Sequence, residues 1–202
     1  MKLKICGMKN PENILEAGKL LPEFMGFIFW EKSPRYLTGV IPKLPESINK
    51  VGVFVNETIN IIHSKIQQHD LQFVQLHGDE SVAYCEHLFQ KNIKIIKVFS
   101  IGNDFDFNLL KPFEPFVDYF LFDTKGKMPG GNGFTFNWKI LQYYQSKKPF
   151  FLSGGIGIDE IVNIKKLKML PFAIDINSKF ETEPGIKDIP SILEFQTQLK
   201  AE

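Results

Sequence analysis

Eight short apolar runs divide the chain at intervals of roughly 20 to 30 residues. They lie at residues 2–6, 25–29, 50–55, 73–77, 93–99, 117–123, 149–154 and 172–177. In most of them apolar residues are nearly continuous and do not alternate with polar ones, which is typical of strands buried on both faces. A chain with this pattern is expected to build a sheet that is covered on both sides.

Helix signals lie between several of these runs. Asn10 followed by Pro11 predicts an N-cap and a first helical turn, and Asp79 and Asp188 predict two further helix starts. Apolar residues at helical spacing are expected to face the core in five segments: Ile14, Ala17, Gly18 and Leu21; Ile59, Ile62 and Ile66; Val82, Cys85, Leu88 and Phe89; Ile158, Ile161 and Val162; and Ile192, Phe195 and Leu199. The intervals after 25–29 and 93–99 give weaker helix signals, because prolines interrupt them.

Strands that alternate with helices predict parallel pairing. Eight such units in 202 residues predict a single-domain (β/α)8 TIM barrel over residues 1–202. The alternative is an open, doubly wound α/β sheet. The number of runs, and the lack of a GxGxxG motif after the first one, favour the closed barrel.

Composition favours a cytoplasmic enzyme or binding protein. The net charge is +1, so no overall field favours nucleic acid or an acidic membrane surface as a partner. Two cysteines are too few for a disulfide framework, and the first residues lack the apolar stretch of a signal peptide. No apolar run has the length of a membrane span, and no His, Cys or carboxylate residues show metal-ligand spacing.

The active site of such a barrel lies at the carboxyl ends of its strands, so the residues that close each run are the candidates. They are Cys6, Phe29, Asn56, His77, Phe99 or Ser100, Asp123, Gly154, Gly155 and Asp175. At this point Cys6 is compatible with a catalytic base or with buried filler. Cys85 falls within a helical stripe and is expected to pack in the core.

The sequence SGG at 153–155 follows the seventh run and leads towards a helix. Glycine lets a backbone approach an anion closely, and in barrels the loops after strands seven and eight often form a phosphate site. Asn177 and Ser178, after the eighth run, could add donors. The simpler interpretation is that Gly154 and Gly155 only form a tight turn.

Three charged or polar residues each have a catalytic and a structural interpretation. Desolvation at a strand end could raise the pKa of Asp123 towards general-acid use, or Asp123 could cap or form an ion pair. Arg35 could hold a carboxylate by two parallel hydrogen bonds, or lie on the surface. His77 could donate to a ligand or shuttle a proton, or bond only to the backbone.

The glycine-rich segment 125–138 is compatible with a mobile lid or a plain connection.

Seven motifs, in order and over the whole length, resemble the phosphoribosylanthranilate isomerase family of tryptophan biosynthesis. They are KICGM at 4–8, GFIFWEKSPRY at 26–36, VGVFVN at 51–56, VQLHG at 74–78, LFD at 121–123 with GGNGFTFNW at 130–138, LSGGI at 152–156 and DINSKFETEPGIKD at 175–188. Each lies at the end of a successive expected strand. The resemblance implies a (β/α)8 barrel that uses no cofactor and no metal.

The resemblance also implies an activity and residue roles. Family members convert N-(5-phosphoribosyl)anthranilate, a small phosphosugar, into 1-(2-carboxyphenylamino)-1-deoxyribulose 5-phosphate by an Amadori rearrangement. The implied general base is Cys6 and the implied general acid is Asp123. Arg35 would hold the anthranilate carboxylate, and Asp175 would bond sugar hydroxyls. The other substrate contacts implied are His77, Gly154, Gly155, Asn177 and Ser178.

Three positions depart from the family pattern. Lys179 stands where glycine is usual in the turn after strand eight, Asn132 replaces a hydroxyl residue, and Asn137 replaces an aspartate. Lys179 could add a cation near the phosphate or bend backbone donors away from it. Competing functions are a phosphosugar isomerase for a larger aminoaldose with two phosphates, and a catalytically silent phosphate-binding barrel. We expect a monomer or a homodimer.

Overall fold

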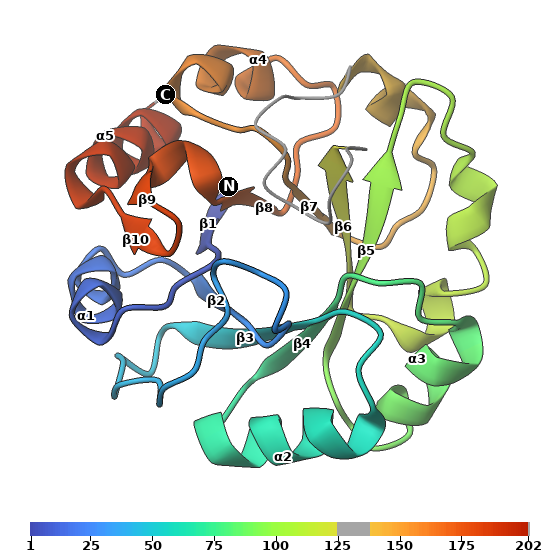
Figure 1. Cartoon of the computed structure of the whole chain (residues 1–202). Coiled ribbons are helices and arrows are strands. Elements are labelled where there is room, and N and C mark those ends of the chain that lie inside the picture. Colours follow the sequence, from blue (N-terminus) through green and yellow to red (C-terminus); the bar gives the residue numbers. More distant parts are fainter. Residues whose placement is uncertain (125–137, 202) are drawn as a thin grey trace.

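The computed structural model of the chain describes residues 1–124 and 138–201. Eight parallel strands pair in chain order, and the first pairs with the last, so that they close into a barrel (Figure 1). They are β1 (Lys2–Ile5), β2 (Phe24–Ile28), β3 (Asn49–Phe54), β4 (Phe73–Leu76), β5 (Ile95–Ile101), β6 (Tyr119–Thr124), β7 (Phe150–Leu152) and β8 (Ala173–Ile176). Each strand coincides with one apolar run, so the predicted (β/α)8 barrel is confirmed.

Two apolar layers explain why the runs are nearly continuous. One fills the barrel interior and consists of Phe24, Val51, Phe73, Ile96, Val98, Leu121, Phe151 and Ala173. The other is larger and packs the outer faces of the strands against the surrounding segments; it includes Phe27, Phe54, Val74, Phe120, Phe122 and Leu152. Successive residues of a strand point to opposite faces, so a strand that serves both layers must be apolar at nearly every position.

Helices cover the outside of the barrel (Figure 1). The described α-helices are α1 (Pro11–Lys19), α2 (Ile59–His69), α3 (Val82–Phe89), α4 (Ile161–Lys165) and α5 (Ile189–Lys200). The described 3-10 helices are η1 (Phe107–Leu110), η2 (Glu114–Phe116), η3 (Trp138–Tyr143), η4 (Ile158–Glu160) and η5 (Ser178–Phe180). Residues 29–48, between β2 and β3, contain no helix, in line with the weak signal there. Over residues 1–124 and 138–201, no helix has both the length and the apolar character needed to cross a membrane.

The helices α1, α3 and α5 each begin after a side chain that accepts a hydrogen bond from a backbone N–H of the first turn. Asn10 accepts a hydrogen bond from the Asn13 N–H, and Asp188 accepts one from the Ser191 N–H, so both predicted N-caps are confirmed. The start predicted at Asp79 is wrong. The N-cap of α3 is Ser81, whose hydroxyl accepts from the Tyr84 N–H, because Asp79 still belongs to the loop and donates its own N–H to Asn56.

Three residues expected in the core are exposed instead: Leu21, Phe89 and Val162 are 56%, 49% and 58% exposed. Leu21 lies beyond the end of α1, where the backbone has left the helix with a φ of 51°. Phe89 is the last residue of α3 and lies at the rim of the core. In the short helix α4 it is Ile164, not Val162, that turns to the core together with Ile161.

A two-stranded antiparallel hairpin follows β8 and was not expected from the sequence. It consists of β9 (Glu181–Glu183) and β10 (Ile186–Lys187). The hairpin is fixed to α1, because the Lys187 N–H donates to Asn13 Oδ1 at 2.7 Å and Asn13 Nδ2 donates to the Lys187 carbonyl at 2.9 Å. It therefore carries Glu181 and Lys187 to the carboxyl end of the barrel at a fixed position.

A buried ion pair ties β5 to the loops after β3 and β4. Lys97 Nζ donates to Glu80 Oε2 at 2.9 Å and to the Gly78 carbonyl at 2.8 Å. Glu80 in turn accepts from the backbone N–H groups of Asn56 and Gly78. Both charged side chains are buried, and buried charges persist only when they are paired and hydrogen-bonded. This network fixes the loop that begins at His77.

Removal of one partner of this pair should be costly. Lys97→Met leaves the Glu80 carboxylate buried without its cation, so the free energy of unfolding should fall by about 3–5 kcal/mol. Lys97→Met/Glu80→Gln should recover part of the loss, because glutamine carries no charge and keeps an oxygen for the Asn56 N–H. Urea denaturation at pH 7 measures both values. Equal losses in the single and double variants would contradict this account.

Candidate active site

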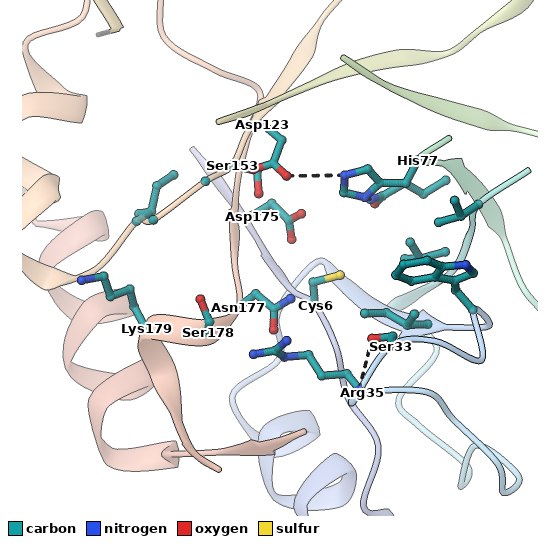
Figure 2. A pocket seen from close by; sticks show the side chains of 18 of the residues that line it. Cys6, Ser33, Arg35, His77, Asp123, Ser153, Asp175, Asn177, Ser178 and Lys179 are labelled. Atoms are coloured by element: carbon teal, nitrogen blue, oxygen red, sulfur yellow. Dashed lines mark hydrogen bonds and ion pairs between the residues drawn. The ribbon is translucent and has the colours of Figure 1, made fainter. Parts of the chain in front are cut away.

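A cavity of about 230 Å³ opens at the carboxyl ends of the strands (Figure 2). It is lined by all the site residues that the family resemblance implies: Cys6, Arg35, His77, Asp123, Gly154, Gly155, Asp175, Asn177 and Ser178. Lys179 lines it as well. These residues come from the ends of β1, β4, β6, β7 and β8 and from the segment after β2. The barrel therefore brings all of them together, and their individual roles stay predictions. Four other candidates that close a run are not among its lining residues: Phe29, Asn56, Phe99 and Ser100.

The cavity has further lining residues that the sequence reasoning missed. They are Ile28, Trp30, Ser33, Pro34, Val53, Val55, Gln75, Ser153 and Ile156. The residues that close a run form only part of the cavity wall, because the strands also contribute residues two positions earlier. Gln75 is such a case, because it precedes His77 by two positions and so lies on the same face of β4.

Cys6 lies at the end of β1, where its N–H donates to the Ile176 carbonyl at 2.9 Å and continues the pairing with β8. The residue is only 5% exposed, yet it lines the cavity. Burial raises the pKa of the Cys6 thiol above its ordinary value, although the nearby Lys4 ammonium acts in the opposite direction. In the free protein at neutral pH the thiol form of Cys6 therefore predominates.

Lys4 is the principal site residue that the sequence reasoning overlooked. It is fully buried, and its Nζ donates to both carboxylate oxygens of Asp175 at 3.0 Å. The signal was available: Lys4 precedes Cys6 by two positions, so both side chains leave the same face of β1. Burial would lower the pKa of the Lys4 ammonium, but Asp175 and Cys6 together outweigh burial and raise it, so Lys4 stays charged.

Arg35 is not a free cation at the rim. Its Nε donates to both oxygens of Glu181 at 2.9 and 3.0 Å, and its Nη2 donates to Glu181 Oε2 at 2.6 Å. The same carboxylate accepts from Lys187 Nζ at 2.7 Å, and Lys187 also donates to Asn177 Oδ1 at 2.7 Å. One edge of the guanidinium is thus held in place. Nη1 has no protein acceptor within residues 1–124 and 138–201, so the other edge can take a ligand.

Asp123 closes β6 and faces His77. Their nearest atoms, Asp123 Oδ2 and His77 Nε2, are 3.4 Å apart, and Figure 2 shows the carboxylate and the ring turned towards each other. Asp123 Oδ1 accepts the Thr124 N–H at 2.9 Å, and Gln75 Nε2 lies 3.4 Å from His77 Nδ1. Asp123 thus has one oxygen fixed by the backbone and one beside a group that can hold a proton. Both the catalytic and the structural interpretation remain compatible with this geometry.

The glycine turn after β7 lies in close contact with the Asp123 carboxylate. Gly154 has a φ of 92°, a conformation that side-chain-bearing residues rarely adopt. A Cβ atom at Gly154 would lie 2.6 Å from the Thr124 nitrogen and 2.8 Å from Asp123 Oδ1. Gly154 and Gly155, with φ of 92° and 66°, therefore form a tight turn, and this geometry is the same whether or not the turn also binds phosphate. Phosphate binding at the same turn stays a prediction, supported by the position of Gly155 and Ser178 on the cavity wall.

Some expectations cannot be compared with the structure. The proposed lid at 125–138 falls, apart from Trp138, outside the described residues, as do Asn132 and Asn137. Lys179 is exposed at the cavity edge. Within the described part of the chain, no group of three or more His, Cys, Asp or Glu residues is arranged to hold a metal ion.

The contacts of Glu181 predict a dependence of stability on pH. Burial would raise the pKa of Glu181, but hydrogen bonds from Arg35 and the charge of Lys187 outweigh it and hold the pKa below its ordinary value. An acid with a lowered folded-state pKa stabilises the fold above its unfolded-state pKa and loses that contribution as the pH falls through the folded-state value. Relative to wild type, Glu181→Gln should be less stable by about 2 kcal/mol at pH 6, and the difference should shrink below about pH 4.3.

Urea denaturation between pH 3 and pH 7 measures this difference. The matched control is Glu183→Gln, which removes an exposed carboxylate from the same strand β9 and should follow the wild-type profile. A difference between Glu181→Gln and wild type that stays constant over this pH range would show that the Glu181 charge does not contribute.

Comparisons with known proteins identify the family of the chain. A family model described as N-(5'phosphoribosyl)anthranilate (PRA) isomerase matches residues 3–198. The chain is 43% identical over 201 residues to the N-(5'-phosphoribosyl)anthranilate isomerase of Phocaeicola vulgatus, covering 99% of this chain and 98% of that protein.

Two solved structures share the fold over nearly the whole chain. One contains monomers of the dimeric phosphoribosylanthranilate isomerase of Thermotoga maritima; it matches with a TM-score of 0.82 at 30% identity, over 99% of this chain and 98% of that one. The other is a phosphoribosyl anthranilate isomerase in complex with reduced 1-(o-carboxyphenylamino)-1-deoxyribulose 5-phosphate, with a TM-score of 0.83, 31% identity and the same coverage. With the family model over almost its full length and a relative at 43% identity, the chain belongs to the N-(5'-phosphoribosyl)anthranilate isomerase family.

Proposed function

We propose that this chain isomerises N-(5-phosphoribosyl)anthranilate to 1-(2-carboxyphenylamino)-1-deoxyribulose 5-phosphate, with Cys6 as general base and Asp123 as general acid. The observation that carries the proposal is that a thiol and a carboxyl group face one cavity at the rim of the barrel. A guanidinium lies at one side of that cavity and a glycine turn at another. Residues 1–202 form one catalytic domain that acts in the cytoplasm as a monomer or homodimer, without metal or cofactor.

The reaction needs one acid and one base in sequence. Asp123 protonates the furanose ring oxygen, so that the ring opens to a Schiff base. The Schiff base acidifies C2′, and the Cys6 thiolate removes that proton. The resulting enolamine tautomerises to the ketone. Substrate and product are isomers, so no oxidant or reductant takes part.

The raised thiol pKa restricts which form of the enzyme reacts. Base catalysis needs the Cys6 thiolate together with a protonated Asp123, and burial makes that thiolate a minor species near neutral pH. A minor thiolate is a stronger base once formed, since proton affinity rises with pKa. Asp175 lies between Asp123 and Cys6 (Figure 2) and is well placed to bond the sugar hydroxyls beside both groups.

The two anionic ends of the substrate have separate partners. The Nη1 edge of Arg35 takes the anthranilate carboxylate while Glu181 holds the opposite edge. Gly154, Gly155 and Ser178 surround the phosphate, and Asn177 can donate its amide because its oxygen is already bonded to Lys187. Lys179, on the same wall, adds a cation near the phosphate.

The test is a fluorescence assay of the purified chain with freshly generated phosphoribosylanthranilate, whose fluorescence disappears on turnover. The chain should be active without added metal and stay active in EDTA. Cys6→Ala and Asp123→Asn should each keep the fold and lose about 10²-fold or more in kcat, the usual value of a general acid or base.

Cys85→Ala is the matched control, because it removes the other buried cysteine, which lies in α3 away from the cavity, and should leave kcat unchanged. Wild-type turnover in Cys6→Ala would show that the thiol is core filler. An inactive wild-type chain would favour a silent phosphate-binding barrel.

Carboxylate recognition by Arg35 is a separate prediction. Arg35→Ala should mainly weaken substrate binding and lower kcat/KM about 10- to 100-fold, the worth of a charged bidentate pair. Arg35→Lys should be only a partial rescue, because a point charge cannot bond Glu181 and a carboxylate on two edges of one plane. Lys32→Ala, a change at an exposed cation of the same segment, serves as the control. An unchanged kcat/KM in Arg35→Ala would rule out this role.

A further inference from the structure

One charged side chain in the barrel interior takes no part in the steps above. Lys4 is fully buried on β1, and its ammonium lies between the base, Cys6, and the carboxylate of Asp175. An apolar residue at this position would have avoided the cost of moving a charge out of water. The question is therefore what a permanent cation does at this point of the barrel.

The backbone brings Lys4 and Cys6 close together. Both side chains leave the same face of β1, and both approach Gly26 on β2, where a Cβ atom would lie 2.7 Å from Cys6 Sγ and 3.2 Å from Lys4 Nζ. Cys6 Sγ and Lys4 Nζ thus both lie beside Gly26, and only glycine at position 26 leaves room for them.

We infer that the Lys4 ammonium sets the fraction of Cys6 present as thiolate, and that Asp175 opposes it by holding the same ammonium. Lys4 is a positioning residue in this reading, since it acts on the substrate only through Cys6. The inference concerns the ionisation of the thiol; its consequence for turnover rests on the proposed role of Cys6 as base.

The other charges around Cys6 are few enough to name. Asp175 approaches from β8, Lys187 from β10, and Lys4 from β1 itself. A cation favours the thiolate and an anion disfavours it. Lys187 lies on another element and bonds to Glu181 and Asn177. Lys4 is the cation that shares a strand with the thiol. Replacement of Lys4 and replacement of Asp175 should thus shift the thiol in opposite directions.

The test measures the thiol directly in the substrate-free protein, in a Cys85→Ala background so that Cys6 is the one reactive cysteine. The rate of alkylation by iodoacetamide is followed between pH 6 and pH 11, together with the ¹³Cβ shift of labelled cysteine. Lys4→Met should raise the thiol pKa by about one unit or more, and so slow alkylation about tenfold at any pH below that pKa. Asp175→Asn should lower the thiol pKa, and Lys4→Arg should stay close to the parent.

The control removes a buried ion pair on the opposite side of the barrel. Lys97→Met/Glu80→Gln acts on β5, across the barrel from β1, and should leave the Cys6 pKa unchanged. If Lys4→Met does not fold, Lys4→Met/Asp175→Asn avoids the unpaired carboxylate and is compared with Asp175→Asn, with the same expected rise. An unchanged thiol pKa on loss of Lys4, or an equal rise in Asp175→Asn, would overturn the inference.

Activity distinguishes this inference from the proposed function. If Cys6 is the base, the limb of the kcat/KM profile that it sets should move with Lys4→Met by as much as the thiol pKa. A thiol that shifts while the profile does not would uphold the influence of Lys4 and refute Cys6 as base. A general loss of stability would not move the thiol pKa and the kcat/KM profile by the same amount, whereas an effect of Lys4 through Cys6 must do so.

Discussion

Four residue pairs join β1 to β8, and in one of them Lys4 lies opposite Asp175. This ion pair stands at the seam where the barrel closes, directly below the rim. Its two contacts of 3.0 Å hold the first and last strands in register by side chains as well as by backbone. Cys6 comes two positions after Lys4, and Asn177 comes two positions after Asp175. The ion pair therefore fixes the positions of these two cavity-lining residues.

The barrel could be predicted because burial of both sheet faces constrains the sequence of every strand. A strand buried on both faces must be apolar at most positions, and eight such runs appear where the eight strands lie. Detail at the helix ends was harder to predict. Asp79 and Ser81 are both good N-caps, and which one serves depends on the contact of Asp79 with Asn56 from another loop.

The candidate site was predictable to the extent that it lies at strand ends. Residues such as Asp123 and His77 close their runs, so position alone singles them out. Lys4 and Glu181 were missed for different reasons. Lys4 interrupts an apolar run, and a charged residue there is ordinarily taken as a surface residue until its buried partner, 171 positions away, is known. Glu181 belongs to a hairpin whose strands are too short to give a periodic signal.

The choice of cation within the site follows the geometry required of it. Arg35 is the only arginine in a chain that otherwise relies on lysine. It stands where a planar group must meet Glu181 on one edge and leave another edge open. Lys4 and Lys187 are buried where a small point charge must fit against oxygen atoms, those of Asp175 for Lys4 and those of Asn177 and Glu181 for Lys187.

The seam between the first and last strands also bears on how the chain is made. Cys6 precedes Asp175 and Lys187 in the chain, so it leaves the ribosome before them. A chain that ends before β8 carries Cys6 and Lys4 but lacks Asp175 and Lys187, two of the charges that surround the thiol in the finished barrel. Chemical competence thus waits for β8 and β10, so chains that end before these strands are expected to be inert towards the sugar rather than weakly active.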